Sequence, residues 1–355
     1  MKNKVYFVAV KDIEDVPESL GKLDLLIRKS EVLGNIHAGW KVAVKTHFGE
    51  EGNTGFVKPP YVRAIGEAIK DKGATGLLSD ANTLYRGKRT NSVDHIKLAA
   101  EHGFTRESVG MDIVIPDCSK KENTVETALY LKHVASAKIA RVFTDADALV
   151  VITHFKGHAL TGFGGSLKNV GMGCATREGK LSQHCDTAPV AFPEKCIGCG
   201  ECVNICPVGA ITLVDSKSSL DRSKCIGCAS CMAVCPTMAL FVDMGAGEEM
   251  QKKMVEYAFA VLHEKKNKCA FFNFAVSINK ECDCWGMENP RIAAYIGILA
   301  SRDPVSIDKA SFDLVNASCG KNIFHEVHPD YDGLDQLEHA QSVGLGNLAY
   351  ELIRL

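Results

Sequence analysis

CIGCGECVNICP at residues 196–207 and CIGCASCMAVCP at residues 225–236 are two copies of one cysteine run. In each copy three cysteines stand three residues apart, and a fourth follows after three further residues and precedes a proline. Two-residue gaps allow three thiolates to curl around one face of a metal centre, and a distant cysteine completes the coordination. The proline cannot continue a helix and turns the chain away. The repeat therefore predicts a small, turn-rich metal-binding unit.

The spacing is the one with which bacterial ferredoxins hold two [4Fe–4S] clusters, where the fourth cysteine of each run binds the other cluster. The predicted ligands are Cys196, Cys199, Cys202 and Cys235 for cluster 1, and Cys225, Cys228, Cys231 and Cys206 for cluster 2. A zinc ribbon needs two CxxC pairs, and a disulfide framework suits a secreted protein, so neither matches the pattern as well. Within each half we expect a ligand loop, a short helix after the fourth cysteine, and a strand.

Length and composition describe an ordinary globular protein. The chain has 355 residues, of which 46% are apolar and 24% charged, and its net charge is −2. This balance predicts neither nucleic acid nor a membrane surface as a partner. We expect no signal peptide and no bilayer-spanning segment, because the apolar runs are too short. Eight of the fifteen cysteines belong to the predicted clusters, which favours the reducing cytoplasm of an anaerobe.

Apolar, β-branched runs on both sides of the cysteine unit predict an α/β fold, with a mostly parallel sheet flanked by helices. The runs cover residues 4–10, 41–48, 75–80, 111–117, 148–155 and 268–278. Helical patterns occupy 59–70, 92–101, 248–266 and 304–317. We expect the α/β domain to comprise residues 1–187 and 245–355, interrupted by a ferredoxin-like α+β insertion at 188–244. Because the insertion has little core of its own, clusters would supply much of its folding free energy.

Polar side chains gather where the predicted strands end. These residues are Lys45, Thr46 and His47 after the second strand, Asp80 and Asn82 after the third, and His154, Lys156 and His158 after the fifth. Ligands of open parallel sheets bind just beyond such carboxyl ends. A single histidine or aspartate there is more often a turn former or a helix cap, but several ends with ionisable groups favour an active cleft. We expect catalytic roles for His47, Asp80, His154 and His158, and cofactor contact for Asn82.

The stretch HALTGFGGSLKNVGMG at residues 158–173 is rich in glycine. Gly164 and Gly165 would let backbone N–H groups approach an anion, and Ser166 and Asn169 would begin a helix over it. Lys168 would add a point charge or a nucleophilic amine. The stretch matches no dinucleotide or Walker motif, so it predicts a small anionic substrate or another anionic cofactor, or else a tightly packed connector. Another anion-binding edge, or a solvated basic loop, is formed by Arg86, Lys88 and Arg89.

Cys282 and Cys284 are separated by one residue. This spacing brings two thiols within reach of one metal, or makes a reactive pair, and is too short for a relaxed disulfide. With His154 or His158 nearby, the sulfur and nitrogen donors suit zinc, iron or nickel in a third metal site. Two buried structural cysteines are the alternative. Weaker candidates are Cys174, His184 and Cys185, which lie in an apparent loop.

Together these residues resemble the domain-of-unknown-function 362 family, whose members are often labelled iron–sulfur centre proteins. The matching stretches are KTHFGE at 45–50, DANTLY at 80–85, HFKGH at 154–158 with the glycine-rich stretch, CDC at 282–284, and GILASRDP at 297–304. The resemblance covers nearly the whole chain and implies one α/β domain split by a two-cluster module, without a settled reaction. Residues 158–168 are also similar to the lactate racemase family, in which a lysine after paired glycines anchors a nickel-pincer nucleotide. That short match fits a shared fold without a shared cofactor as well.

Two kinds of function are compatible with these features. In the first, an oxidoreductase takes electrons from a redox partner protein through the clusters to a substrate or metal in the cleft, and His154 or His158 handles protons. In the second, the chain is a ferredoxin-type electron carrier or reductive activator that serves a partner enzyme without catalysis of its own. A nucleic-acid-binding role lacks both a basic surplus and a recognisable motif.

Overall fold

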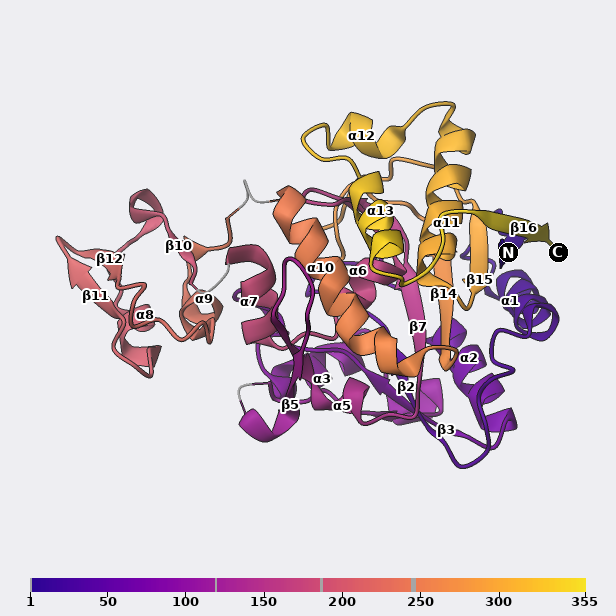
Figure 1. The fold of residues 1–355 in the computed structure, drawn as a ribbon, viewed down its shortest axis with the longest axis horizontal. Coiled ribbons are helices and arrows are strands. Elements are labelled where there is room, and N and C mark those ends of the chain that lie inside the picture. Colours follow the sequence, from indigo (N-terminus) through magenta and orange to yellow (C-terminus); the bar gives the residue numbers. More distant parts are fainter. Residues whose placement is uncertain (1, 119, 186–187, 244–246) are drawn as a thin grey trace.

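An eight-stranded sheet forms the centre of the protein in the computed structural model, which describes residues 2–118, 120–185, 188–243 and 247–355. The strand order is β16-β1-β15-β14-β7-β2-β3-β4 (Figure 1). The bounds are β1 Asn3–Ala9, β2 Lys41–Lys45, β3 Thr75–Ser79, β4 Asp112–Ile113, β7 Ala148–His154, β14 Cys269–Ala275, β15 Gly297–Ser301 and β16 Tyr350–Arg354. Every neighbouring pair is parallel except those that β15 makes with β1 and β14. The predicted α/β class with a mostly parallel sheet is confirmed.

Helices cover both faces of this sheet. The central strands β7 and β14 are buried at every position, as strands covered on two sides should be. On one face, Val44, Val150 and Phe272 pack in one core with α1 (Val16–Ser30) and α2 (Pro59–Asp71). On the other face, the alternate residues Leu149 and Phe271 pack with α10 (Gly247–Leu262) and α11 (Pro304–Cys319).

The remaining elements of the α/β part are short. They are the helices α3 Ser92–Glu101, α4 Arg106–Val109, α5 Arg141–Thr144, α6 Ser166–Gly171, α7 Arg177–Cys185, α12 Ile323–Val327 and α13 Leu334–Ser342, and the strands β5 Thr124–Ala128, β6 Ser136–Ala140, β8 Lys156–His158 and β9 Gly162–Gly164, with 3-10 turns at Lys121–Asn123 and His263–Lys265. Strands β5 and β6 form one antiparallel hairpin and β8 and β9 another. Among the described residues, no helix has the length and apolar character that crossing a membrane requires.

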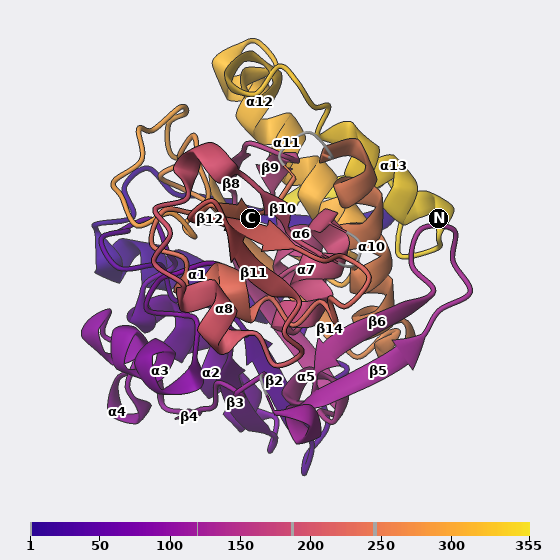
Figure 2. The same cartoon turned by 90° about the vertical axis from the view of Figure 1, so that its left-hand side faces the viewer.

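The cysteine repeat lies in a separate module that projects from the sheet on the side opposite both chain ends (Figure 1), and it faces the viewer in Figure 2. Its elements are β10 Val190–Ala191, a 3-10 turn at Pro193–Lys195, α8 Glu201–Ile205, β11 Ile211–Val214, β12 Lys217–Leu220, α9 Ser230–Val234 and β13 Leu240–Phe241. Strands from before and after this module pair with each other in the central sheet, as β7 does with β14.

Each short helix of the module comes before the fourth cysteine of its run, so the prediction of a helix after that cysteine is wrong. Gly200 and Ala229 adopt left-handed backbone conformations (φ 78° and 58°), and the helices begin at the next residues. They end before Pro207 and Pro236, which supply no N–H for another helical turn. As a result, Cys202 and Cys231 lie on the helices, and the other ligand candidates lie in the adjoining loops.

Candidate functional site

A cavity of about 130 Å³ lies beyond the carboxyl ends of β2, β3 and β7. Ten of the residues expected in the cleft line it, namely His47, Asp80, His154, His158, Gly164, Gly165, Lys168, Asn169, Cys282 and Cys284. They come from segments far apart in the sequence, which the parallel register of β2, β3 and β7 brings to one edge of the sheet. The fold thus gathers at one place the groups that were chosen from separate strand ends.

Asn82 and Ser166 do not line the cavity. The side-chain oxygen of Asn82 accepts the N–H of Cys118 at 3.2 Å. Ser166 donates its hydroxyl to Asn273, and its backbone N–H to Asp308 at 2.7 Å. Asp308 also accepts the N–H of Leu167 and so occupies the start of α6. The N–H groups that were expected to hold an anion there are therefore already bound by a carboxylate.

Cys282 is paired with an ammonium group. The Nζ of Lys168 donates to its Sγ at 3.4 Å, and the backbone N–H of Cys284 donates at the same distance. The pKa of Cys282 lies well below its ordinary value, because a hydrogen bond from the Cys284 thiol and the charges of Lys168 and Lys156 outweigh burial. The pKa of Cys284 is raised by its contact with Cys282 and by burial. The pair is thus one buried thiolate beside one thiol.

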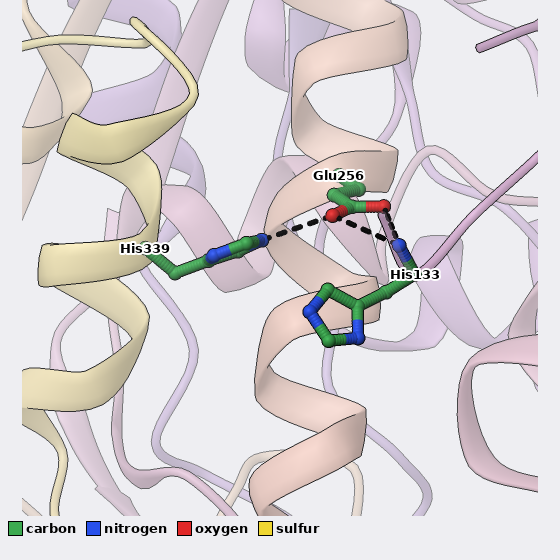
Figure 3. Close-up of side chains that lie close together, drawn as sticks. All are labelled: His133, Glu256 and His339. Carbon is green, nitrogen blue, oxygen red and sulfur yellow. Dashed lines mark hydrogen bonds and ion pairs between the residues drawn. The ribbon is translucent and has the colours of Figure 1, made fainter. Parts of the chain in front are cut away.

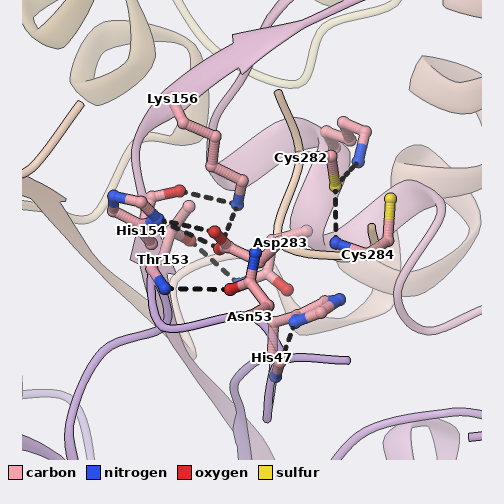
Figure 4. A network of polar contacts seen from close by, with 12 residues as sticks. His47, Asn53, Thr153, His154, Lys156, Cys282, Asp283 and Cys284 are labelled. Carbon is pink, nitrogen blue, oxygen red and sulfur yellow. Dashed lines mark hydrogen bonds and ion pairs between the residues drawn. The ribbon is translucent and has the colours of Figure 1, made fainter. Parts of the chain in front are cut away.

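The sequence alone did not single out Asp283 as a functional residue. Its carboxylate links the turn that carries Cys282 and Cys284 to His154 at the end of β7 (Figure 4). Both of its carboxylate oxygens lie 3.0 Å from Nδ1 of His154, and Lys156 Nζ lies 3.2 Å away. These partners lower the pKa of Asp283 although it is completely buried. The Nε2 of His154 faces the carbonyls of Val276 and Ser277. Both ring nitrogens of His154 are therefore engaged inside the protein, and this ring orients Asp283.

A second network joins the ends of β2 and β3. Lys45 Nζ lies 2.9 Å from Asp80, and Arg89 contacts Glu50 at 3.1 Å and Nε2 of His47 at 3.0 Å. Arg89 is only 3% exposed, so the solvated-loop interpretation is wrong for it. Its neighbours Arg86 and Lys88 are exposed as that interpretation expects. The local sequence does not show that Arg89 is buried while its neighbours are exposed, because the partner of Arg89 is Glu50, 39 positions away.

Cations outnumber carboxylates around the cavity. The lining includes Lys45, Arg89, Lys156, Lys168 and Lys180, against the single carboxylate of Asp80. Adding Glu50 and Asp283, which pair with lining residues, and the Cys282 thiolate leaves five cations and four anions, an excess of one positive charge. Three buried atoms of lining residues, Nη2 of Arg89, Nδ1 of His184 and Oδ2 of Asp80, have no hydrogen-bond partner among the described residues. An anionic ligand would satisfy both the charge and the open donor.

Three histidines of the cavity, His47, His158 and His184, have lowered pKa values. Burial, then the charge of Lys168, holds the pKa of His158 well below its ordinary value, and the same causes lower the pKa of His184 to about 4. The Nδ1 of His158 accepts the N–H of Leu160 at 3.2 Å, which leaves the ring hydrogen on Nε2. Burial, then Arg89, likewise lowers the pKa of His47. His158 is thus set up as a hydrogen-bond donor rather than as a base.

The cysteine module supplies one wall of the cavity. Phe241 and Val242, at the end of β13, line it together with Tyr85 and Trp285 of the α/β part. Tyr85 stacks on Trp285 with ring centroids 6.1 Å apart, and contacts Phe241 at 5.7 Å. On α7, Arg177 donates to the carbonyl of Ala229 at 2.8 Å and interacts electrostatically with the predicted cluster ligands on either side of that residue, Cys228 and Cys231.

The predicted cluster 1 ligands Cys196, Cys199, Cys202 and Cys235 line one small pocket, although Cys235 belongs to the second run. Backbone N–H groups donate to three cysteine sulfurs: Ser218 to Cys196 at 3.3 Å, Ala210 to Cys206 at 3.2 Å and Ala239 to Cys235 at 3.2 Å. Such donors stabilise negative charge on sulfur, and they lower the pKa of Cys196. The donor set and its arrangement fit the group that the spacing predicts.

Of the weaker candidates, only His184 reaches the cavity. Cys174 is completely buried in the main core, where burial raises its pKa to about 12. Cys185 is buried in the core between the α/β part and the module, with Leu181 and Phe241. Both cysteines are therefore packed among apolar core residues.

Comparisons with known proteins bear on this geometry. No functionally curated protein matches the chain. Two solved structures are similar to it: the lactate racemase apoprotein from Thermoanaerobacterium thermosaccharolyticum, at 14% identity and a TM-score of 0.42, and a protein from Thermotoga maritima, at 12% and 0.43. They cover 88% and 85% of this chain, which spans only 58% and 59% of theirs. The model of a family described as "Domain of unknown function (DUF362)" matches residues 42–313, and the chain therefore belongs to that family.

Proposed function

We propose that this protein is an iron–sulfur oxidoreductase that delivers electrons to an anionic substrate, or to a metal or anionic cofactor, in the cavity at the sheet edge. The observation that carries the proposal is the shared wall: Phe241 and Val242 of the cysteine module line the same cavity as Cys282 and Lys168. A redox module and a charged cleft in direct contact suit electron transfer within one chain.

The eight cysteines of the repeat would hold two [4Fe–4S] clusters, with the ligand sets that the sequence predicts. Such clusters exchange one electron at a time with a partner protein and with an acceptor. The N–H donors on Cys196, Cys206 and Cys235 would stabilise the charge of that centre. Helix α9, which carries Cys231, lies where the module contacts the α/β part, and Arg177 of α7 donates there to the carbonyl of Ala229. The second ligand set would therefore be nearer to the cleft.

Within the cleft, we assign different roles to the cationic residues, to His158 and to the Cys282 thiolate. Arg89, Lys45 and Lys180 would bind and orient an anionic group, with Nη2 of Arg89 as the open donor. The Nε2–H of His158 would donate a hydrogen bond to a group that gains electron density. The Cys282 thiolate would bind a metal or a reactive carbon, and Lys168 would keep it charged.

The alternative is an electron carrier or activator for a partner enzyme, and the surface of the module favours a docking face of that kind. Large apolar side chains are exposed around the predicted cluster ligands, namely Ile197, Ile205, Val208, Leu213, Val214, Ile226 and Met238. An exposed apolar patch next to a redox centre is suited to transient contact with another protein. An oxidoreductase that takes electrons from a partner would need the same face.

Anaerobic purification with metal analysis and a two-residue variant tests the assignment. We expect about eight iron atoms per chain from two clusters. His158→Ala combined with Lys168→Ala should abolish any reductase activity of the parent and leave the iron content unchanged. Retention of every such activity in the double variant would refute the role of the cleft. Tight binding to one partner protein, with no small-molecule turnover by the parent, would select the carrier function instead.

A further inference from the structure

The side chains of two histidines and one glutamate lie close together beside helices α10 and α13 (Figure 3). His133 lies in the turn between β5 and β6, Glu256 on α10 and His339 on α13. One ligand atom from each of the three lies within 4.8 Å of the others. None of these residues lines the cavity at the sheet edge, and the charge pairs described there do not involve them.

One separation matches the edge of a metal coordination tetrahedron. Zinc binds histidine nitrogen and carboxylate oxygen at about 2.0–2.1 Å, so two ligands in tetrahedral geometry stand roughly 3.3 Å apart. Nε2 of His339 lies 3.1 Å from Oε1 of Glu256, in agreement with that edge. The carboxylate of Glu249, on the same face of α10 as Glu256, lies 3.4 Å from Nδ1 of His133, but it is not among the ligand atoms that all lie within 4.8 Å of one another. A water molecule would therefore complete the set.

The surroundings prepare these groups to act as ligands. Glu256 is completely buried, and its Oε2 accepts backbone N–H bonds from His133 at 3.0 Å and Val134 at 2.7 Å. These bonds fix the carboxylate and leave Oε1 directed at His339. A metal would take the place of the hydrogen between Oε1 and Nε2.

Two lysines of α10 lie near the group. Lys253 Nζ lies 3.8 Å from Glu249, and Lys252 pairs with Glu248. The three carboxylates of Glu248, Glu249 and Glu256 outnumber these two lysines by one negative charge, which favours the binding of a cation. Without a metal the same residues form a hydrogen-bonded clasp between the hairpin, α10 and α13, and this is the alternative that the experiment must separate.

We propose that His133, Glu256 and His339 bind one divalent ion of the zinc class, with water as fourth ligand, and so clasp the β5–β6 hairpin to α10 and α13. The site is separate from the cavity, and it does not depend on the redox function.

Zinc binding by the anaerobically purified, cluster-loaded protein tests the proposal. Cys282→Ser and Cys284→Ser together provide a background in which the cleft thiols cannot bind zinc. After incubation with zinc sulfate and desalting, this protein should retain one zinc per chain. His339→Asn, which still donates a hydrogen bond to Glu256, and His133→Ala should each weaken zinc binding by at least about 100-fold. His325→Ala, on the exposed helix α12, is the matched control and should bind like the background.

The zinc absorption edge provides a second readout that identifies the ligands. We expect nitrogen and oxygen neighbours near 2.0–2.1 Å, whereas zinc captured by cluster cysteines would show sulfur near 2.3 Å. Unchanged zinc binding in both His133→Ala and His339→Asn, a sulfur-dominated spectrum, or no zinc in the background protein would each overturn the proposal. Iron content, measured in the same samples, reports on the clusters independently, so failure of the redox function would be recognised separately.

Discussion

Replacing Lys168 by methionine should turn the Cys282 thiolate into a thiol at neutral pH. Unit charges 3.4 Å apart attract by roughly 5 kcal/mol at an effective dielectric constant of about 20. That energy corresponds to about 3.5 pKa units. Because Lys168 is partly exposed and solvent screens some of this attraction, we expect the pKa of Cys282 to rise by roughly 2–3 units in the variant.

Alkylation with iodoacetamide measures this change, because the thiolate is the reactive form. Peptide mapping by mass spectrometry follows Cys282 alone, in a Cys284→Ser background for both proteins. Below the pKa of Cys282 the rate falls tenfold per pH unit, so the variant's profile should shift to higher pH by the same 2–3 units. Lys138→Met removes a lysine paired with Glu178 outside the cavity and is the control, which should leave the profile in place. Equal profiles for Lys168→Met and its parent would refute the ion pair.

Three further predictions concern the same region. Asp283→Asn should lower the free energy of unfolding by about 3–5 kcal/mol in urea, because His154 and Lys156 lose their buried counter-charge; the exposed Asp94→Asn should change it little. Burial lowers the pKa of Lys180 to about 8, so this side chain loses its charge above that pH. Sulfate should therefore bind more weakly at pH 9 than at pH 7, as measured by calorimetry. The Lys180→Arg variant should show no such loss of binding. Arg177→Met removes a cation beside Cys228 and Cys231, so voltammetry should find one cluster potential lowered by roughly 40 mV, equivalent to about 1 kcal/mol, and no shift would argue against the contact.

The main sheet was largely predictable because its strands are covered on both faces. Continuous apolar runs such as 148–155 and 268–278 correspond to β7 and β14, and proline or aspartate marks the starts of α2 and α11. The run at 111–117 became only the two-residue strand β4, at the sheet edge where one neighbour is present. Strand β15, which is antiparallel to both of its neighbours, went unrecognised although α11 begins soon after it ends.

The position of the cleft was predictable from the sequence, whereas the charge pairs within it were not. A general rule for parallel sheets located it, since Lys45, Asp80 and His154 all end strands. The charge pairs that organise it join residues distant in sequence, such as Asp283 with His154 and Arg89 with Glu50. Nothing near Asp283 in the chain marks it as the centre of a buried network. The module's contribution of Phe241 and Val242 depends on tertiary docking, which no local pattern encodes.

The pairing of β7 with β14 has a consequence for how the protein is made. Residues 155–268, including the whole cysteine module, form one long excursion between these two adjacent strands. Closing such an excursion costs chain entropy before the strands can pair, and a compact module between them reduces that cost. With the proposed clusters bound, a module with so little core would gain much of its order from metal. Iron supply during synthesis would therefore govern not only whether the protein is redox-active but how quickly its central sheet can assemble.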